Sequence, residues 1–315
     1  MNEIRYSRRT VLTLASGAAA IVAAGCGGGK GSRPAAAVEG LATVVRTPQV
    51  AADGTAVATA VPSPTPAPTA FAAGAEERAL LVGTPWETTL SIRHSGSLGP
   101  AVLLLGGVHG NEPGGWLAAE ELMAFQPRAG SLLVLPRANQ LAMSDFVRTY
   151  DELGDLNRLY PGNAQSVLPM ERLAAAIVAV SREFGVDVVL DLHESWAFYS
   201  TRTQSGTAFL GQTITAGVGP RNPGFVSELV DRVNLRIGLE RDYMVARDGS
   251  AFRRPETTPT DQATSRGRSS LSLGGHVQGL TPILVEMGQE DQPIERRVAL
   301  HLLVAEEALT LLGVA

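Results

Sequence analysis

The chain has 315 residues, a formal net charge of −5 at pH 7, and 44% hydrophobic residues. This composition is sufficient for a medium-sized domain with a large core, and it excludes a chain that is disordered throughout. The acidic balance provides no reason to expect the basic face that nucleic-acid binding usually needs, so we expect no nucleic-acid partner.

The N-terminal segment predicts an export signal. Residues 7–12 read Ser-Arg-Arg-Thr-Val-Leu, a twin-arginine pattern, and an apolar run follows at 11–24. The run is too short and too rich in small residues for a good membrane span. It leads to Ala-Ala-Gly-Cys at Cys26, the only cysteine, which resembles the lipobox of bacterial lipoproteins. We therefore expect residues 1–26 to be a twin-arginine, lipoprotein-type signal, with a lipidated Cys26 anchoring the exported protein at the extracellular face of the cell membrane. An ordinary cleaved signal peptide is the alternative.

Residues 27–75 are predicted to be a linker rich in proline, alanine and threonine. Residues 61–68 alternate proline with small residues, and no aromatic residue occurs in the linker before Phe71. Such a segment favours extended polyproline II structure and cannot bury a core. We expect a stalk that holds the following domain away from the membrane, and a proline-rich docking ligand is the alternative.

Residues 76–315 are predicted to form one α/β domain. Short apolar runs predict strands at 80–82, 88–92, 101–105, 132–135, 186–190 and 282–285. Longer apolar patterns predict helices at 114–125, 170–184, 225–237 and 294–312, with loops at 137–168 and 247–275. Continuous apolar strands are typical of a sheet buried on both faces, so the alternation with helices predicts a mainly parallel, mixed sheet flanked by helices.

Residues with metal-binding and acid–base side chains follow the predicted strands. His109 and Glu112 follow the strand at 101–105, and His193 follows the strand at 186–190. In open α/β sheets, ligand sites gather at the carboxyl ends of the strands. A spacing of three on a turn entering a helix aims His109 and Glu112 the same way, and catalytic zinc usually has three protein ligands plus water. The sequence therefore predicts a site for one Zn²⁺ ion formed by His109, Glu112 and His193.

The three other histidines are not expected to bind the metal. We expect His94, in a predicted strand, and His301, in the last predicted helix, to lie at the surface. His276 lies in a glycine-rich loop near the strand at 282–285 and is left outside the predicted ligand set.

Four short motifs, in order, carry a resemblance to a known family. They are Gly-Gly-Val-His-Gly-Asn-Glu-Pro at 106–113, Asp-Leu-Asn-Arg at 155–158, Asp-Leu-His at 191–193 and Val-Glu-Met-Gly at 285–288. Together they resemble the succinylglutamate desuccinylase/aspartoacylase branch of the zinc carboxypeptidase superfamily, over about residues 101–315. The resemblance implies a zinc carboxypeptidase-like fold, and it matches the three predicted ligands to the family's zinc ligands.

The resemblance also implies roles for five further residues. Glu286 matches the general base that activates the hydrolytic water. Asn157 and Arg158 match a pair that binds a substrate carboxylate, and Asp155 matches the carboxylate that orients the first zinc histidine. Arg148 matches the arginine that polarises the scissile carbonyl. The tetrapeptide Asn-Pro-Asp-Gly of the true carboxypeptidases is absent from this chain.

These residues predict a zinc-dependent hydrolase that cleaves an amide or related acyl bond in an N-acyl amino acid or peptide. One alternative is a cell-surface metallocarboxypeptidase or an amidase of peptidoglycan peptides, which the predicted export favours. A non-catalytic zinc-binding or solute-binding lipoprotein is the other. The arginines of the loop at 247–275 are either readers of an anionic substrate or solvated surface.

Overall fold

The computed structural model describes residues 70–221, 224–248 and 268–315. The predicted signal at 1–26, residues 27–69 of the predicted linker and residues 249–267 of the predicted loop lie outside the described residues. Among the helices of the described ranges, none combines the length and the apolar character needed to cross a membrane.

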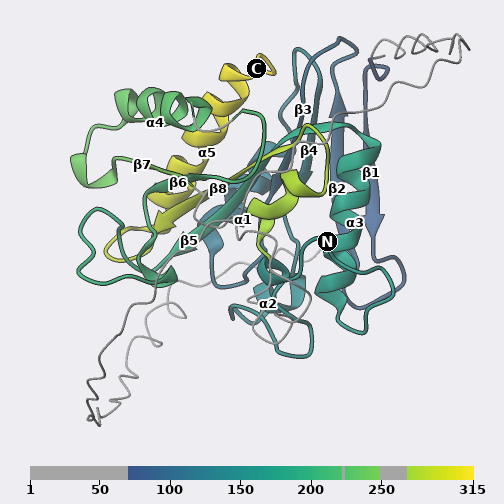
Figure 1. The fold of residues 1–315 in the computed structure, drawn as a ribbon, viewed down its shortest axis with the longest axis horizontal. Coiled ribbons are helices and arrows are strands. Elements are labelled where there is room, and N and C mark those ends of the chain that lie inside the picture. The colour runs from purple at the N-terminus through teal and green to yellow at the C-terminus, as the bar shows by residue number, and fades with distance from the viewer. Residues whose placement is uncertain (1–69, 222–223, 249–267) are drawn as a thin grey trace, which may run out of the picture. The chain divides into compact units, whose positions relative to one another are not determined.

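A mixed sheet forms the centre of the described domain (Figure 1). Its strands are β1 (Gly74–Leu80), β2 (Thr88–His94), β3 (Ala101–Leu105), β4 (Ser131–Leu135), β5 (Val186–Ser195), β6 (Thr213–Ala216), β7 (Val245–Asp248) and β8 (Thr281–Gly288). Across the sheet their order is β1-β2-β4-β3-β5-β8-β6-β7. The central strands β4, β3, β5 and β8 run parallel, whereas β2 pairs with β4 and β6 pairs with β8 in antiparallel orientation. The predicted mixed sheet with a parallel centre is confirmed.

Helices cover both faces of this sheet (Figure 1). The α-helices are α1 (Pro113–Leu122), α2 (Gln140–Ser144), α3 (Pro169–Glu183), α4 (Gly224–Arg236) and α5 (Ile294–Leu311). Short 3-10 helices occur at η1 (Leu156–Arg158), η2 (Thr207–Phe209), η3 (Glu240–Asp242) and η6 (Ser270–Gly275). Helices α1, α4 and α5 pack on one face, and α3 packs on the other.

Strand β3 shows how the sheet divides the core into two layers. All five of its residues are buried. Val102 and Leu104 pack with the residues of α1, α4 and α5, whereas Leu103 and Leu105 pack with those of α3. Successive side chains of a strand point to opposite faces, so only an unbroken apolar run satisfies both layers. This requirement explains why the sequence predicted the bounds of β3 correctly.

The sequence prediction misplaced one strand and missed two. The strand predicted at 80–82 is wrong, because β1 ends at Leu80 and the chain then turns, with a φ of +55° at Leu81. Strand β1 lies at the sheet edge and carries exposed charged residues, a pattern that blocks pairing with other chains but conceals the strand in the sequence. Strands β6 and β7, which were not predicted, have four residues each and are too short to show a periodic pattern.

The carboxyl end of β5 extends beyond the predicted bounds. The strand continues past Leu190 to Ser195, and Val188 to Ser195 pair in register with Thr281 to Gly288 of β8. The extension places the Asp-Leu-His motif inside a strand rather than in the loop after it. Alternate side chains therefore have fixed directions at the sheet edge where the predicted ligands were expected.

Candidate metal centre

The loop between β3 and α1 positions two of the predicted ligands. It carries His109 and Glu112, and both are buried. Gly110 lies against α2, where an added Cβ would come within 2.0 Å of the Ala142 backbone. Its amide also donates a hydrogen bond of 3.2 Å to the Arg148 carbonyl oxygen. Glycine is needed here because only a residue without a side chain allows this close approach.

Strands β5 and β8 supply the third ligand and the candidate base. His193 of β5 is paired in register with Glu286 of β8, in the parallel ladder that joins the two strands. Register partners on adjacent parallel strands point to the same face of the sheet, about 4.8 Å apart. His193 and Glu286 are 1% and 7% exposed, so both are held in a buried site by regular secondary structure.

The three predicted ligands converge. His109 Nδ1 lies 2.7 Å from Glu112 Oε1, and His193 Nδ1 lies 2.8 Å from Glu112 Oε2. The two Nδ1 atoms are 3.1 Å apart. Among the described residues, these three are the group of histidine and acidic side chains that could hold a metal ion. Zinc with ligands at about 2.0–2.1 Å in a tetrahedron needs neighbouring ligand atoms about 3.3 Å apart, so the observed set is close to the required size.

The hydrogen bonds of the first histidine favour a cation at this point. His109 Nε2 lies 3.1 Å from Asp155 Oδ1 and donates its proton to this carboxylate. In the neutral tautomer that this bond selects, Nδ1 carries a lone pair aimed at Glu112 and at the Nδ1 atom of His193. The nitrogen atoms of two imidazoles and the Glu112 carboxylate therefore converge on one point, where a bound metal ion would satisfy them all.

The electrostatics of the ligands agree with this interpretation. Burial raises the pKa of Glu112, but His109 and His193 lower it more strongly, so Glu112 is ionised at neutral pH. Burial lowers the pKa of His193, but Asp191 and Glu112 oppose this and raise it well above its ordinary value. The site therefore stabilises a positive charge, which either a proton or a metal ion can supply.

Glu286 lies beside the ligands and is poised to exchange a proton. Burial raises the pKa of Glu286 to about 7, and the charge of Glu112 adds to this effect, while His193 and Ser195 oppose it. The Ser195 hydroxyl donates a hydrogen bond of 2.7 Å to Glu286 Oε2. A carboxylate with a pKa near the working pH can both accept and return a proton.

Asp155 and Arg148 border the site on the side of His109. Arg148 Nη2 lies 3.2 Å from Asp155 Oδ2, and its Nη1 lies 3.4 Å from Glu112 Oε1. Burial raises the pKa of Asp155. The hydrogen bond to His109 and the charges of His109, Arg148 and Arg158 outweigh this effect, so the pKa lies below its ordinary value. The Arg148 side chain is 42% exposed, so its guanidinium is accessible to a substrate at the edge of the site.

Asn157 and Arg158 lie in η1, directly after Asp155. The Asp155 side chain accepts a hydrogen bond of 2.9 Å from the Asn157 amide and caps this short helix. Asn157 is buried, and its Oδ1 accepts a hydrogen bond of 3.4 Å from the Ser270 amide. Arg158 donates to the Asn157 carbonyl oxygen and makes no ion pair within 4 Å in the described part of the chain. The structure thus brings all eight predicted site residues to one edge of the sheet.

Two buried residues beside this site were given no role by the sequence. Asp191 is 1% exposed, and its Oδ2 lies 3.1 Å from His193 Nε2, although the pair is not aligned for a hydrogen bond. Burial raises the pKa of Tyr160, and the charge of Asp191 adds to the effect. The Asp-x-His spacing is a sequence signal for Asp191, because residues two apart on a strand share a face. No comparable signal identifies Tyr160.

The expectation of a surface position for His301 is wrong. His301 is completely buried in α5, and burial lowers its pKa to about 3, with the nearby Arg297 adding to the effect. Its position follows from helical spacing, because Val304, Ala305 and Ala308 on the same stripe are buried as well. His94 Nδ1 bonds to Ser131 Oγ and its ring stacks on Phe71, away from the metal ligands.

His276 lies away from the candidate centre. Its carbonyl oxygen accepts a hydrogen bond of 2.9 Å from Arg182, at the C-terminal end of α3. That end of α3 leads into the start of β5, so His276 is at the sheet edge opposite the metal ligands.

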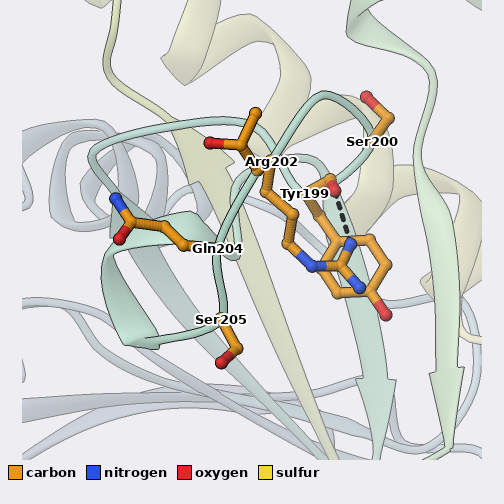
Figure 2. Close-up of a pocket in the computed structure, with 6 residues that line it drawn as sticks. Tyr199, Ser200, Arg202, Gln204 and Ser205 are labelled. Atoms are coloured by element: carbon orange, nitrogen blue, oxygen red, sulfur yellow. Dashed lines mark hydrogen bonds between the residues drawn. The ribbon is translucent and has the colours of Figure 1, made fainter.

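An open depression lies on the loop after β5 (Figure 2). Its volume is about 390 Å³, and it is lined by Tyr199, Ser200 and residues 202–205. The Arg202 side chain lies flat over the Tyr199 ring and donates to the Tyr199 carbonyl oxygen, as Figure 2 shows. None of the predicted site residues lines this depression. The candidate metal centre is therefore identified from the side chains that converge there, and not from this depression.

Comparisons with known proteins agree with the motif resemblance. The family model described as succinylglutamate desuccinylase/aspartoacylase catalytic domain matches residues 98–201. This range contains every predicted site residue except Glu286. No curated protein matches the sequence.

Solved structures share the fold. The apo structure of the cell shape determinant Csd4 from Helicobacter pylori matches with a TM-score of 0.56 and 19% identity, covering 69% of this chain and 51% of Csd4. An aspartoacylase family protein from Mesorhizobium loti matches with a TM-score of 0.54 and 21% identity, covering 77% of this chain and 68% of its own. A succinylglutamate desuccinylase/aspartoacylase from Rhodobacter sphaeroides has a TM-score of 0.50, with 20% identity, and covers 72% of this chain and 60% of its own.

At these identities the likeness concerns the fold, and the chain spans about half the length of the Csd4 structures. The predicted zinc carboxypeptidase-like fold is confirmed. The predicted resemblance is confirmed as well, since residues 98–201 match the succinylglutamate desuccinylase/aspartoacylase family.

Proposed function

We propose that this protein is a zinc-dependent hydrolase that cleaves an amide or related acyl bond in a small carboxylate-bearing substrate. The observation that carries the proposal is the convergence of His109, Glu112 and His193, with their ligand atoms 2.7–3.1 Å apart, beside the buried Glu286. The match to a succinylglutamate desuccinylase/aspartoacylase catalytic domain supports the same class of reaction.

Each part of the site has a chemical task in this reaction. His109, Glu112 and His193 would hold the zinc ion, which would supply a water of pKa about 7 as the nucleophile at neutral pH. Glu286 accepts the proton of the attacking water at its buried carboxylate and returns it to the leaving amine. Asp155 holds the ring of His109 by accepting its Nε2 proton, which leaves Nδ1 free to bind the metal.

The two arginines at the border of the site would bind the substrate. The accessible guanidinium of Arg148, within 3.4 Å of Glu112, stabilises the negative charge that develops on the carbonyl oxygen. Arg158, together with Asn157, binds the substrate carboxylate, because its guanidinium has no carboxylate partner in the described part of the chain. A neutral substrate would leave that guanidinium unpaired.

A second candidate is a cell-surface metallocarboxypeptidase or an amidase of peptidoglycan peptides. This chain shares its fold with Csd4, for which a tripeptide-bound structure is known, and this likeness supports the second candidate. A form of Csd4 bound to mDAP is described as that of a D,L-carboxypeptidase. A peptide C-terminus offers Arg158 the same carboxylate as an N-acyl amino acid, so the present site is compatible with both substrates.

We also propose that the protein acts outside the cell, exported by its twin-arginine segment and anchored through a lipid on Cys26. The support is the sequence pattern that ends at the only cysteine. Metabolic labelling with a clickable fatty acid should label the wild type but not Cys26→Ala, and the variant should leave the membrane fraction. Equal labelling of the two proteins would contradict the anchor.

The activity is tested with protein stripped of metal by a chelator and then loaded with zinc. We expect hydrolysis only after loading, and a panel of N-acyl amino acids against muropeptides identifies which substrate class is cleaved. Tight zinc binding without turnover of either class would favour the non-catalytic alternative. Activity that is unchanged by stripping would contradict the proposal.

A further inference from the structure

A buried ion pair lies close to the metal ligands, on the other face of β5. Glu194 follows the ligand His193 in the strand, and its side chain therefore points to the opposite face, toward α1 and α5. Arg297 of α5 donates a hydrogen bond of 2.6 Å to Glu194 Oε2. The two side chains are 0% and 12% exposed, so the pair is almost fully removed from water.

The Glu194 carboxylate also contacts the beginning of α1, the helix that Glu112 precedes. An added Cβ on Gly114 would lie 2.2 Å from Glu194 Oε1, so any larger residue would displace this carboxylate. Helix α1 has no acidic residue in its first turn and no side-chain cap. The N-terminal end of a helix attracts negative charge, and Glu194 supplies this charge from a neighbouring strand.

Gln289 joins the same carboxylate to the loop that carries the ligands. Its Nε2 donates hydrogen bonds of 3.1 Å to Glu194 Oε2 and 2.9 Å to the Asn111 carbonyl oxygen. Asn111 directly precedes Glu112 in the sequence. The main-chain amide of Gln289 donates a hydrogen bond of 2.9 Å to the carbonyl oxygen of Ser195, two residues after His193. Gln289 therefore holds the residues beside two ligands at a fixed separation.

The main chain of Glu194 contacts a ligand directly. Its amide donates a hydrogen bond of 3.0 Å to Glu112 Oε2, the oxygen that faces His193 Nδ1 at 2.8 Å. Glu194 thus links the ion pair to the ligand, because its side chain accepts a hydrogen bond from Arg297 and its amide donates one to Glu112.

We propose that Glu194, Arg297 and Gln289 form a positioning cluster. The cluster holds the Glu112 carboxylate beside the His193 ring and so determines the affinity of the metal centre. The inference rests on the proposed function, because it requires that the centre binds zinc. These residues touch neither metal nor substrate, and they act through the ligands. Partners behind metal ligands commonly change metal affinity by about 10- to 100-fold when they are mutated.

The test compares two charge-neutralising variants. Glu194→Gln removes the negative charge of the ion pair, and so the counter-ion of Arg297, with little change in shape. Glu307→Gln is the matched control, because Glu307 is a buried carboxylate of α5 that pairs with Arg232 at 2.9 Å and Arg236 at 2.8 Å, away from the ligands. Zinc affinity is measured by competition with a chromophoric chelator, the melting temperature by circular dichroism, and ligand geometry by the visible spectrum of the Co²⁺-loaded protein.

We expect Glu194→Gln to weaken zinc binding by about 10- to 100-fold and to change the Co²⁺ spectrum. The control should keep the wild-type zinc affinity and spectrum even if its melting temperature falls. Similar losses of melting temperature in both variants, with zinc affinity unchanged in Glu194→Gln, would overturn the inference.

If Glu194→Gln does not fold, Gln289→Leu provides the test, because it removes the bridging amide and leaves the ion pair intact. We expect a several-fold weaker zinc affinity, and an unchanged affinity would overturn the inference. A wild-type protein that binds no zinc would overturn the proposed function as well. Zinc binding by the wild type that is equalled by Glu194→Gln would overturn only the positioning cluster.

Discussion

The two faces of the carboxyl end of β5 hold buried charges in different ways. On the face covered by α1, α4 and α5, Glu194 has its own counter-ion, because Arg297 lies 2.6 Å away. On the other face, four carboxylates, those of Glu112, Asp155, Asp191 and Glu286, surround two histidines. Arg148 is the one arginine within 4 Å of any of the four in the described part of the chain.

This difference indicates which face is built for a ligand. Burying a carboxylate costs free energy unless the carboxylate is paired. The face covered by α1, α4 and α5 meets this requirement with residues of the chain itself. The other face concentrates four carboxylates around two histidines, so we infer that a cation from outside completes it. Substitutions on the two faces should therefore have different effects.

Removing a ligand should have the largest effect. Glu112→Ala removes the oxygens that face both histidines, so we expect zinc affinity to fall by at least about a thousand-fold, with activity lost in parallel. Zinc content after dialysis, measured by atomic emission, reports the result. Glu120→Ala on the outer part of α1 is the control. A Glu112→Ala protein that retains one equivalent of zinc would show that the cation is held elsewhere.

Glu286→Gln should leave the zinc affinity nearly intact and lower kcat by about 10²–10⁴-fold, because an amide cannot accept the proton of the attacking water. The neighbouring exposed Glu290→Gln provides the control and should keep wild-type kcat. Steady-state kinetics of fully loaded proteins make the comparison. Wild-type turnover by Glu286→Gln would remove Glu286 from the mechanism.

Arg148→Met should lower kcat by about 10²–10³-fold, because the developing oxyanion loses its guanidinium partner. Arg137→Met, which breaks a surface ion pair with Glu120, should have kcat close to that of the wild type. A rise in KM alone for Arg148→Met would instead place this arginine in substrate binding.

The smallest effect expected is on stability and concerns His301 of α5. Burial lowers its pKa to about 3, below the ordinary value of 6.5. As the pH falls below 6.5, the unfolded chain binds a proton that the folded chain refuses, so the folded state loses up to about 1.4 kcal/mol per pH unit. This loss continues down to about pH 3, and above pH 6.5 His301 adds no pH dependence.

His301→Met should remove this part of the acid sensitivity. Between pH 7 and pH 5, we expect the free energy of unfolding of the variant to fall by about 2 kcal/mol less than that of the wild type. Urea unfolding of both proteins at the two pH values measures the difference. Identical losses would show that His301 is protonated, or hydrated, in the folded protein.

The sequence predicted those features that depend on local pattern. Unbroken apolar runs identified β3 and β8, because strands buried on both faces allow few other residues. The ligand set was predictable because His109 and Glu112 are three residues apart and His193 belongs to a short motif at a strand end. Helical spacing in α5 contained the information that His301 is buried, and the sequence prediction did not use it.

Other features depend on pairings between distant residues. Glu194 and Arg297 are 103 residues apart, and neither belongs to a pattern that predicts a buried ion pair. The charged segment of β1 forms a strand only because β2 offers it an edge, and β6 forms only between β8 and β7. Tertiary context decides these structures, and local propensity does not.

Diffraction at the zinc absorption edge, from crystals of zinc-loaded protein, tests the central claim most directly. We predict a single anomalous peak within about 2.0–2.2 Å of the Nδ1 atoms of His109 and His193 and of a Glu112 carboxylate oxygen. A peak coordinated by other residues, or no peak at this edge of the sheet in a protein that contains zinc, would contradict it.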